Sequence, residues 1–388
     1  MSLAQQHVPG VLRHLRRLTQ SFVQEGQHIA YIHVYARPLA PGREPPLEFI
    51  TAQESGFEGI ACVDDAARAA LLALHTHALL APQPQEQERA AVALGLAHDW
   101  LRFVTYMQEP DGRFINFIAD AAGTKNRQGR TSYAGGPWWT ARAMWALATA
   151  GRATGEERYR QHVLRGRLTP TRDLKVTAIQ ALALMELYQR RPEPRLRQRI
   201  CALCDAIVAS GPGYFRDRKG RGEVALWGYH QLQAVAQAAR LFARLDYVRA
   251  CQETVRNLIA PVVAGGFYHV YPHQRDGQCA YSVSTLVLGL EELYRLSGRS
   301  ADRALALECA DWLAGHNAAH TVLYDPETGC CSDGIAGGRA SSDCGAESAI
   351  EAGFVELVRR RLQGGAHARP AVHAALGGGQ DRCNRRID

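Results

Sequence analysis

The chain has 388 residues, of which 46% are hydrophobic, and it carries a formal net charge of +7. The positive charge is spread along the chain as arginine in mixed-sign surroundings, without the aromatic-interleaved basic block that nucleic-acid binding requires. The sequence begins without the apolar core of a signal peptide and has no run of about 18 uncharged apolar residues. We therefore expect a cytoplasmic protein with a large core that binds neither nucleic acid nor a membrane.

The ten cysteines are expected to be reduced thiols rather than a disulfide framework. Cys201 and Cys204 fall within a helical pattern, where both suit a hydrophobic core. Cys330, Cys331 and Cys344 flank a glycine-rich loop, and we expect these thiols to line a pocket. Because no cysteines and histidines have the paired spacing of a zinc site, the sequence predicts no metal and no cofactor.

Helical periodicity with breaker-rich interruptions runs through almost the whole chain, and strand-like alternation is confined to short pieces such as 29–35. The pattern predicts an all-α fold with twelve helices, near 8–24, 64–80, 87–106, 137–151, 156–166, 174–190, 196–210, 227–244, 247–262, 281–297, 302–316 and 345–362. From Gln363 onward the glycine-rich sequence predicts a disordered tail. Residues 1–362 would then form a single domain.

The links between the predicted helices alternate in length. Short links, as at 151–155 and 297–300, follow alternate helices, whereas the links that lead into those same helices are mostly long. Several long links also share a rough motif, a turn followed by an aromatic residue, at the same place in successive helix pairs, which indicates a repeat of helical hairpins. Six such hairpins can close into a double ring, the (α/α)6 toroid, with the inner helices' N-termini around a cavity at the long-loop face. The alternative is an open α-solenoid, which would have shorter and more equal loops.

Three acids stand at the N-terminal ends of the proposed inner helices. Asp64 and Asp65 begin an alanine- and leucine-rich helix that is expected to be buried all round. Asp64 suits an N-cap and Asp65 suits the positive end of the helix dipole, but a cap requires only one acid. Glu347 opens the last helix after a glycine-rich approach that lets the backbone come close to a ligand. Glu351, one turn further on, is either a second dipole acid or a surface residue.

The other residues gathered at these helix ends have the character of a carbohydrate site. Aromatic rings stack on the C–H faces of sugars, while charged and hydroxyl groups bond the sugar hydroxyls. The residues expected to bind substrate are Arg68, Tyr133, Trp138, Trp139, Arg142, Trp227, His230, Tyr281 and Asp343. Any single tryptophan among them also suits a core, and it is their collection at one end that points to a site.

Three segments carry a resemblance to a known family. They are Val63-Asp64-Asp65-Ala66-Ala67-Arg68-Ala69, Arg142-Ala143-Met144-Trp145-Ala146-Leu147 and Gly345-Ala346-Glu347-Ser348-Ala349-Ile350-Glu351-Ala352. With the twelve-helix pattern, they resemble the six-hairpin glycosidase superfamily over residues 1–362, and the layout is similar to that of the family-nine endoglucanases. That resemblance implies a catalytic base at Asp64 or Asp65 and a catalytic acid at Glu347. The two aspartates are adjacent here, whereas those of the endoglucanases are separated by two residues.

The sequence leaves three functions open. The leading hypothesis is an inverting glycoside hydrolase acting on an oligosaccharide, with one carboxylate activating water and the other protonating the leaving oxygen. The second is a sugar epimerase or polysaccharide lyase with His230 or Tyr281 as its base. The third is a non-catalytic protein that binds glycans, because the toroid hosts all of these functions.

Overall fold

A ring of six inner helices organises the computed structural model, which describes residues 10–40 and 46–364. These helices are α2 (Val63–Leu80), α4 (Pro137–Thr154), α6 (Leu174–Arg190), α8 (Gln231–Phe242), α11 (Ala280–Ser297) and α13 (Ala346–Gln363). Each packs against the next, and α13 packs against α2, so that the ring is closed. Most of their residues are buried, which is why their sequences are apolar on nearly every face.

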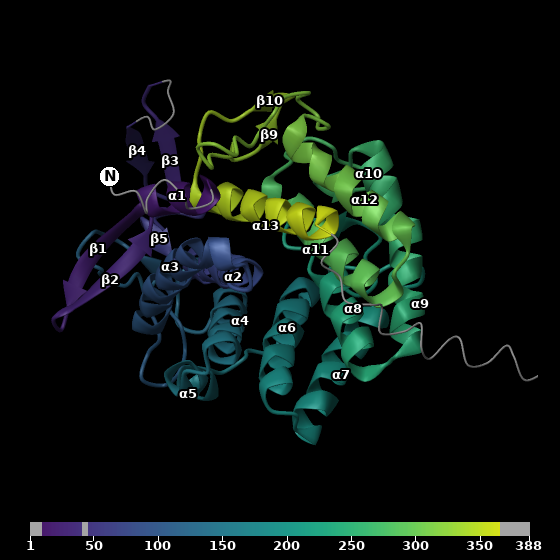
Figure 1. The fold of residues 1–388 in the computed structure, drawn as a ribbon, viewed down its shortest axis with the longest axis horizontal. Coiled ribbons are helices and arrows are strands. Elements are labelled where there is room, and N and C mark those ends of the chain that lie inside the picture. Colours follow the sequence, from purple (N-terminus) through teal and green to yellow (C-terminus); the bar gives the residue numbers. More distant parts are fainter. Residues whose placement is uncertain (1–9, 41–45, 365–388) are drawn as a thin grey trace, which may run out of the picture.

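A second layer of helices surrounds the ring. Its members are α1 (Gly10–Arg17), α3 (Gln87–Tyr106), α5 (Glu157–Arg165), α7 (Pro194–Val208), α9 (Leu245–Thr254) and α12 (Ser300–Ala310). Five of them pack on the inner helix that precedes them, whereas α1 packs on α13, from the other end of the chain (Figure 1). A π-helical segment, Val255–Ile259, leads from α9 into the short α10 (Ala260–Gly265). The fold is all-α and is the predicted (α/α)6 toroid.

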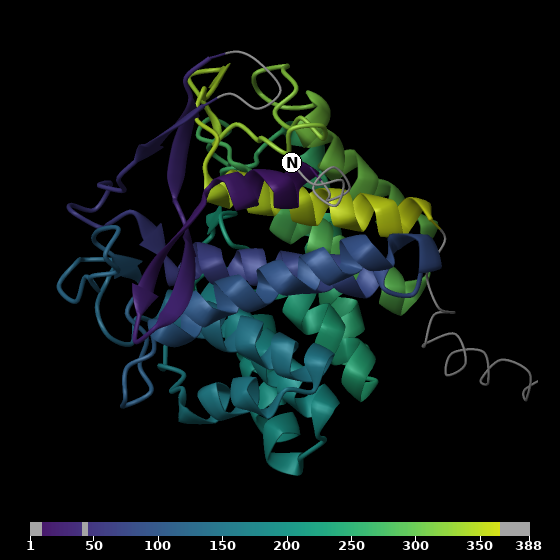
Figure 2. The same cartoon turned by 60° about the vertical axis from the view of Figure 1, so that its left-hand side comes forward.

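The long segments before the inner helices carry five small antiparallel sheets. The pairs are β1 (Thr19–Gln24) with β2 (Gln27–Ile32), β3 (Tyr35–Pro38) with β4 (Leu47–Ile50), β5 (Ala61–Cys62) with β6 (Phe117–Ile118), β7 (Val224–Ala225) with β8 (Val270–Tyr271), and β9 (Ile335–Ala336) with β10 (Arg339–Ala340). Figure 2 shows the strands and long loops gathered at one end of the helices, on the left of the view. The links at the other end are short, since only residues 155–156 separate α4 from α5. The predicted alternation of loop length is confirmed.

Some predicted boundaries are wrong. The helix predicted over 8–24 ends at Arg17, because residues 19–32 form the β1–β2 hairpin, whose Phe22, Ile29 and Tyr31 point into the core. The helix predicted from 227 begins at Gln231, after Gly228 turns the chain with a φ of 71°. The last helix extends to Gln363, and the predicted tail lies outside the described residues from 365 onward.

The cysteines depart from the prediction at one point. Cys330 and Cys344 form a disulfide, with their Cα atoms 5.8 Å apart, because the loop that carries β9 and β10 doubles back between them. The expectation that both are reduced thiols is therefore wrong. Cys201, Cys204 and Cys331 are free, as expected. No helix in the described part of the chain combines the length and the apolar character needed to cross a bilayer.

Candidate functional site

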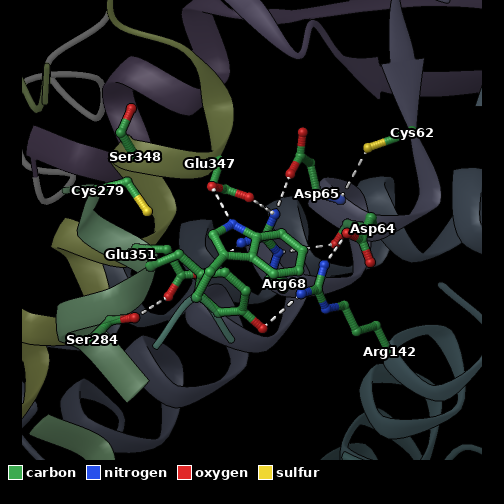
Figure 3. Close-up of polar contacts among 12 residues, drawn as sticks. Cys62, Asp64, Asp65, Arg68, Arg142, Cys279, Ser284, Glu347, Ser348 and Glu351 are labelled. Carbon is green, nitrogen blue, oxygen red and sulfur yellow. Dashed lines mark hydrogen bonds and ion pairs between the residues drawn. The ribbon is translucent and has the colours of Figure 1, made fainter. Parts of the chain in front are cut away.

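The guanidinium of Arg68 lies at the centre of the long-loop face. Arg68 is only 3% exposed, and its Nη2 donates to Asp65 Oδ1 at 2.6 Å and to Glu347 Oε2 at 3.0 Å (Figure 3). Its Nη1 donates to Glu351 Oε1 at 2.7 Å. Since α2 and α13 are neighbours in the ring, residues far apart in sequence place three carboxylates around one cation.

The two aspartates lie inside the first turn of α2 rather than at its cap. Strand β5 runs up to Cys62, which is the N-cap: its backbone is extended, and its Sγ accepts from the backbone N–H of Asp65 at 3.4 Å. The prediction of Asp64 as the N-cap is therefore wrong. Both carboxylates are left for contacts with other elements of the ring.

Asp64 differs from Asp65 in how its oxygens are used. Its side chain is 16% exposed, and Oδ2 forms an ion pair with Arg142 of α4. Its other oxygen, Oδ1, is enclosed and accepts no hydrogen bond from the described chain. Because enclosed acceptors are normally satisfied, this unpaired oxygen is unusual, and it is free to accept a hydrogen bond that the described chain does not supply.

A cavity of 370 Å³ opens beside these acids. It is lined by Asp64, Asp65, Arg68 and Glu347 together with polar groups from other segments, Tyr35, Glu54, Glu58, Asn116, Thr131, Asp333 and Ser348. The predicted catalytic acids therefore meet at one cavity, formed by the starts of α2 and α13 and by the loops before the inner helices.

The acids of this cavity hold their protons with different strengths. Burial raises the pKa of Asp333 to about 6, against the opposing effect of hydrogen bonds from Ser348 and from the backbone of Gly345. Burial and the hydrogen bond with Glu54 raise the pKa of Glu58. The pKa of Asp65 is also raised, chiefly by burial. Hydrogen bonds lower the pKa of Glu54, against the opposing effect of its burial. The cavity therefore holds acids whose pKa values are shifted in opposite directions, as acid and base chemistry requires.

Three aromatic residues, Trp138, Trp227 and Tyr281, form a wall behind Arg68, and arginine side chains of the protein itself contact the faces of these rings. Trp138 and Trp227 lie 5.0 Å apart between ring centroids, and the Arg142 guanidinium lies 5.0 and 5.3 Å from those rings. The Tyr281 ring lies 4.6 Å from the Arg68 guanidinium. None of these three aromatic residues is among the residues lining the 370 Å³ cavity. The wall holds the arginines in place, and Trp227 also donates from Nε1 to Glu347 Oε1 at 3.1 Å.

Other residues predicted to bind substrate lie apart from the cavity. Trp139 is 6% exposed and belongs to the core, with Tyr133 exposed against its edge. Asp343 forms an ion pair with Arg37 near the surface. The buried His230 bonds Gln233 and Tyr281 through its two ring nitrogens, and burial lowers its pKa to about 3, so it is neutral.

The sequence did not single out three acids of this region. Glu351, predicted to be a dipole acid or a surface residue, is only 1% exposed and accepts from Ser284 Oγ at 2.5 Å. Its position four residues after Glu347, on the same face of an inner helix, was the available signal. Asp333 and Glu58 come from irregular segments whose course the periodicity does not define.

Replacing Trp139 with phenylalanine tests its placement in the core. The indole Nε1 donates to the carbonyl of Phe114 at 2.8 Å, and that carbonyl also accepts from the backbone N–H of Gly135 at 2.9 Å, so Trp139→Phe removes one of its two donors. We expect a loss of about 1 kcal/mol in the free energy of unfolding and no change in affinity for saccharides. Denaturant unfolding and binding calorimetry on the same variant measure the two effects. A weakened affinity with unchanged stability would return Trp139 to the binding surface.

The sequence matches no protein-family model and no curated protein. Solved structures do match. The cellobiose 2-epimerase of Bacillus thermoamylovorans B4167 aligns with a TM-score of 0.65 at 10% identity, over 91% of this chain and 96% of that one. The fold is that of the six-hairpin toroid enzymes. A family 76 glycoside hydrolase from a bovine Bacteroides thetaiotaomicron strain aligns at 0.59 with 13% identity (92% and 77% covered), and the family 9 endoglucanase J30 at 0.54 with 14% (92% and 84%). The resemblance drawn from the sequence is thus confirmed for the toroid fold.

Proposed function

We propose that this toroid is a carbohydrate-active enzyme that hydrolyses a glycosidic bond of an oligosaccharide in the 370 Å³ cavity. The observation that carries the proposal is the enclosed, unpartnered Oδ1 of Asp64. A general base must accept a proton from a hydroxyl within hydrogen-bond reach, and this oxygen is an acceptor with no competing donor in the described chain. The ion pair with Arg142 fixes the orientation of the same carboxylate.

Asp333 is the general acid in this proposal. Its pKa of about 6 leaves part of the population protonated near neutral pH, as proton donation to a leaving oxygen requires. Glu347, the acid expected from the sequence, already accepts N–H groups on both oxygens, from Arg68 and from Trp227. We therefore assign to Glu347 the role of positioning these two side chains.

Asp65 is not the base in this proposal. The Arg68 guanidinium contacts both Asp65 and Glu347, so it occupies the space between them. An inverting glycosidase needs room for a water between its two carboxyl groups, which stand roughly 6.5–9.5 Å apart. We therefore propose Asp333 as the acid and Asp64 as the base, rather than Glu347 with Asp65.

A sugar epimerase is the second candidate, favoured by the TM-score of 0.65 to a cellobiose 2-epimerase. The bases expected for it from the sequence, His230 and Tyr281, are buried and bonded to each other at 3.1 Å, and neither lines the cavity. An epimerase would instead draw its base from the cavity carboxylates. Its product would keep the glycosidic linkage and differ at one stereocentre.

The experiment is a panel of oligosaccharides, with reducing-end release and NMR of the products as readouts. Hydrolysis should decline as the pH rises through about 6, because Asp333 must be protonated to act. Asp333→Asn should lower turnover of a poor leaving group by about 10²-fold and spare an activated aryl glycoside.

Asp246→Asn is the matched control, since Asp246 is exposed, pairs with Arg244 and lies outside the cavity, so it should leave turnover unchanged. If the product is epimerised and no reducing end is released, the protein is a sugar epimerase, the second candidate, and not a hydrolase. Binding of saccharides without any turnover would make the protein non-catalytic.

A further inference from the structure

A second and larger cavity, of 1120 Å³, lies at the other end of the ring. It extends from the C-terminal turns of the inner helices, such as Arg152 of α4 and Arg295 of α11, into the ring as far as Gln233 in the first turn of α8. His75 of α2, Trp145 of α4 and Gln237 of α8 also line it. In Figure 2 this is the end away from the strands. None of its lining residues also lines the 370 Å³ cavity, so the two are separate places in the fold.

Buried polar groups of this cavity lack partners. Gln237 is only 8% exposed, yet its side-chain amide makes no hydrogen bond within the described chain. Gln233 Oε1 accepts from His230 Nδ1 at 2.8 Å, and its Nε2 has no acceptor in the described chain. Neither amide is sealed off from the cavity, so both are open to hydrogen bonds with the hydroxyl groups of a bound ligand.

His75 adds a third group of this kind. Its imidazole lies in the cavity wall, makes no hydrogen bond within the described chain, and lies edge-on to the Phe354 ring, at 6.3 Å between centroids. Burial and the nearby guanidiniums of Arg361, Arg152 and Arg295 lower its pKa to about 3. It is therefore neutral and offers one donor and one acceptor.

The charges of the cavity are nearly balanced. Seven arginines and four glutamates stand among the described residues that line it. Arg152 pairs with Glu186 at 2.5 Å, while Arg240 and Arg295 pair with Glu292 at 3.2 and 3.0 Å. Arg89 also pairs with Glu86 at 3.0 Å and Arg361 with Glu291 at 2.6 Å, so five of the seven arginines are held in ion pairs. The cavity therefore favours a neutral polar ligand over an anion.

We propose that this cavity is a second saccharide-binding site, distinct from the catalytic one. The unpaired amides of Gln233 and Gln237 and the neutral imidazole of His75 would bond sugar hydroxyls, and the indole of Trp145 would contact a sugar's C–H face. The ligand class is a neutral saccharide of disaccharide size or larger. This inference does not depend on the proposed catalytic roles.

The test follows Trp145 by fluorine NMR in protein labelled with 5-fluorotryptophan, with the resonance assigned by Trp145→Phe. Cellobiose, maltose, lactose and sucrose are titrated to about 100 mM, which saturates a site of millimolar Kd. At least one should shift the Trp145 resonance. Gln237→Leu should raise the midpoint by about three- to tenfold, which corresponds to the loss of one hydrogen-bonding group.

Gln85→Leu is the matched control, because Gln85 is exposed and lines neither cavity, and it should leave the midpoint unchanged. A thermal melt verifies that Gln237→Leu is folded. Preference for an anionic ligand is tested with glucose 6-phosphate and with the variant Arg360→Gln, because Arg360 is exposed at the cavity. The proposal is overturned if no disaccharide shifts Trp145, if Gln237→Leu leaves the midpoint unchanged, or if only glucose 6-phosphate acts and Arg360→Gln abolishes its effect. The readout is binding at Trp145, so it is independent of whether the protein hydrolyses sugars.

Discussion

Replacing Arg68 with methionine is expected to destabilise the fold by at least about 3–5 kcal/mol at neutral pH. The side chain bonds three carboxylates, and two of them, Asp65 and Glu351, are buried. Methionine fills a similar volume but leaves these acids without a counter-charge. Denaturant unfolding followed by circular dichroism measures the loss.

The pH dependence of that loss identifies its cause. Burial raises the pKa values of Asp65 and Glu351, so the folded state binds more protons than the unfolded state, and stability falls as the pH rises through the raised values. Arg68 opposes this rise in both groups, so its removal steepens the dependence. The deficit of Arg68→Met should therefore be smaller at pH 5 than at pH 8.

Two further variants complete this comparison. Adding Glu351→Gln to Arg68→Met should restore part of the stability, because one buried charge is removed. Arg37→Met is the control: its pair with Asp343 is exposed, so its loss should cost less than about 1 kcal/mol. A deficit in Arg68→Met that is equal at both pH values would mean lost packing rather than unpaired charge.

Asp64→Asn is expected to lower turnover by about 10²- to 10⁴-fold. The amide keeps the size of the carboxylate but cannot take a proton, so natural oligosaccharides and activated aryl glycosides should suffer alike, since both need the attacking water. Substrate affinity should change much less than turnover. Initial rates and binding calorimetry on the two substrates measure the two quantities.

Asp65→Asn separates the two neighbouring aspartates. Because Asp65 is buried and bonded to Arg68, its substitution should mainly lower the melting temperature and reduce turnover far less. Comparable turnover in Asp64→Asn and the unmodified protein, with a collapse in Asp65→Asn, would reverse the assignment of the base.

The ring was predictable because long and short links alternate and because helices such as α2 and α11 are apolar on nearly every side. The apolar surface follows from burial, because each inner helix packs between two inner neighbours and an outer helix. Strand β1 was missed because its apolar residues also fit a helical pattern of a few turns, whereas the strand-like alternation noted at 29–35 overlaps β2. Local patterns of that length do not decide between the two structures.

The site was predictable only in part. The acids that open α2 and α13 meet as expected, because an N-terminal position on an inner helix fixes which end of the toroid a residue occupies. Adjacent residues of one helix face different ways, however, so the sequence did not separate Trp138 in the wall from Trp139 in the core. Arg68, on which the carboxylates converge, was predicted only to bind substrate. Its partners Glu347 and Glu351 come from α13, far along the sequence, so the sequence did not reveal these ion pairs.

The closure of the ring by the two ends of the chain has a consequence for synthesis. The imidazole of His14 in α1 lies 3.1 Å from the carbonyl of Cys344, across almost the whole sequence, and α2 needs α13 to cover its remaining face. During translation the apolar faces of α1 and α2 therefore remain exposed until residues 346–363 leave the ribosome. Contacts of such long sequence separation form late and slowly. Nascent chains of this protein should accordingly depend on chaperones that shield apolar helices until the last hairpin arrives.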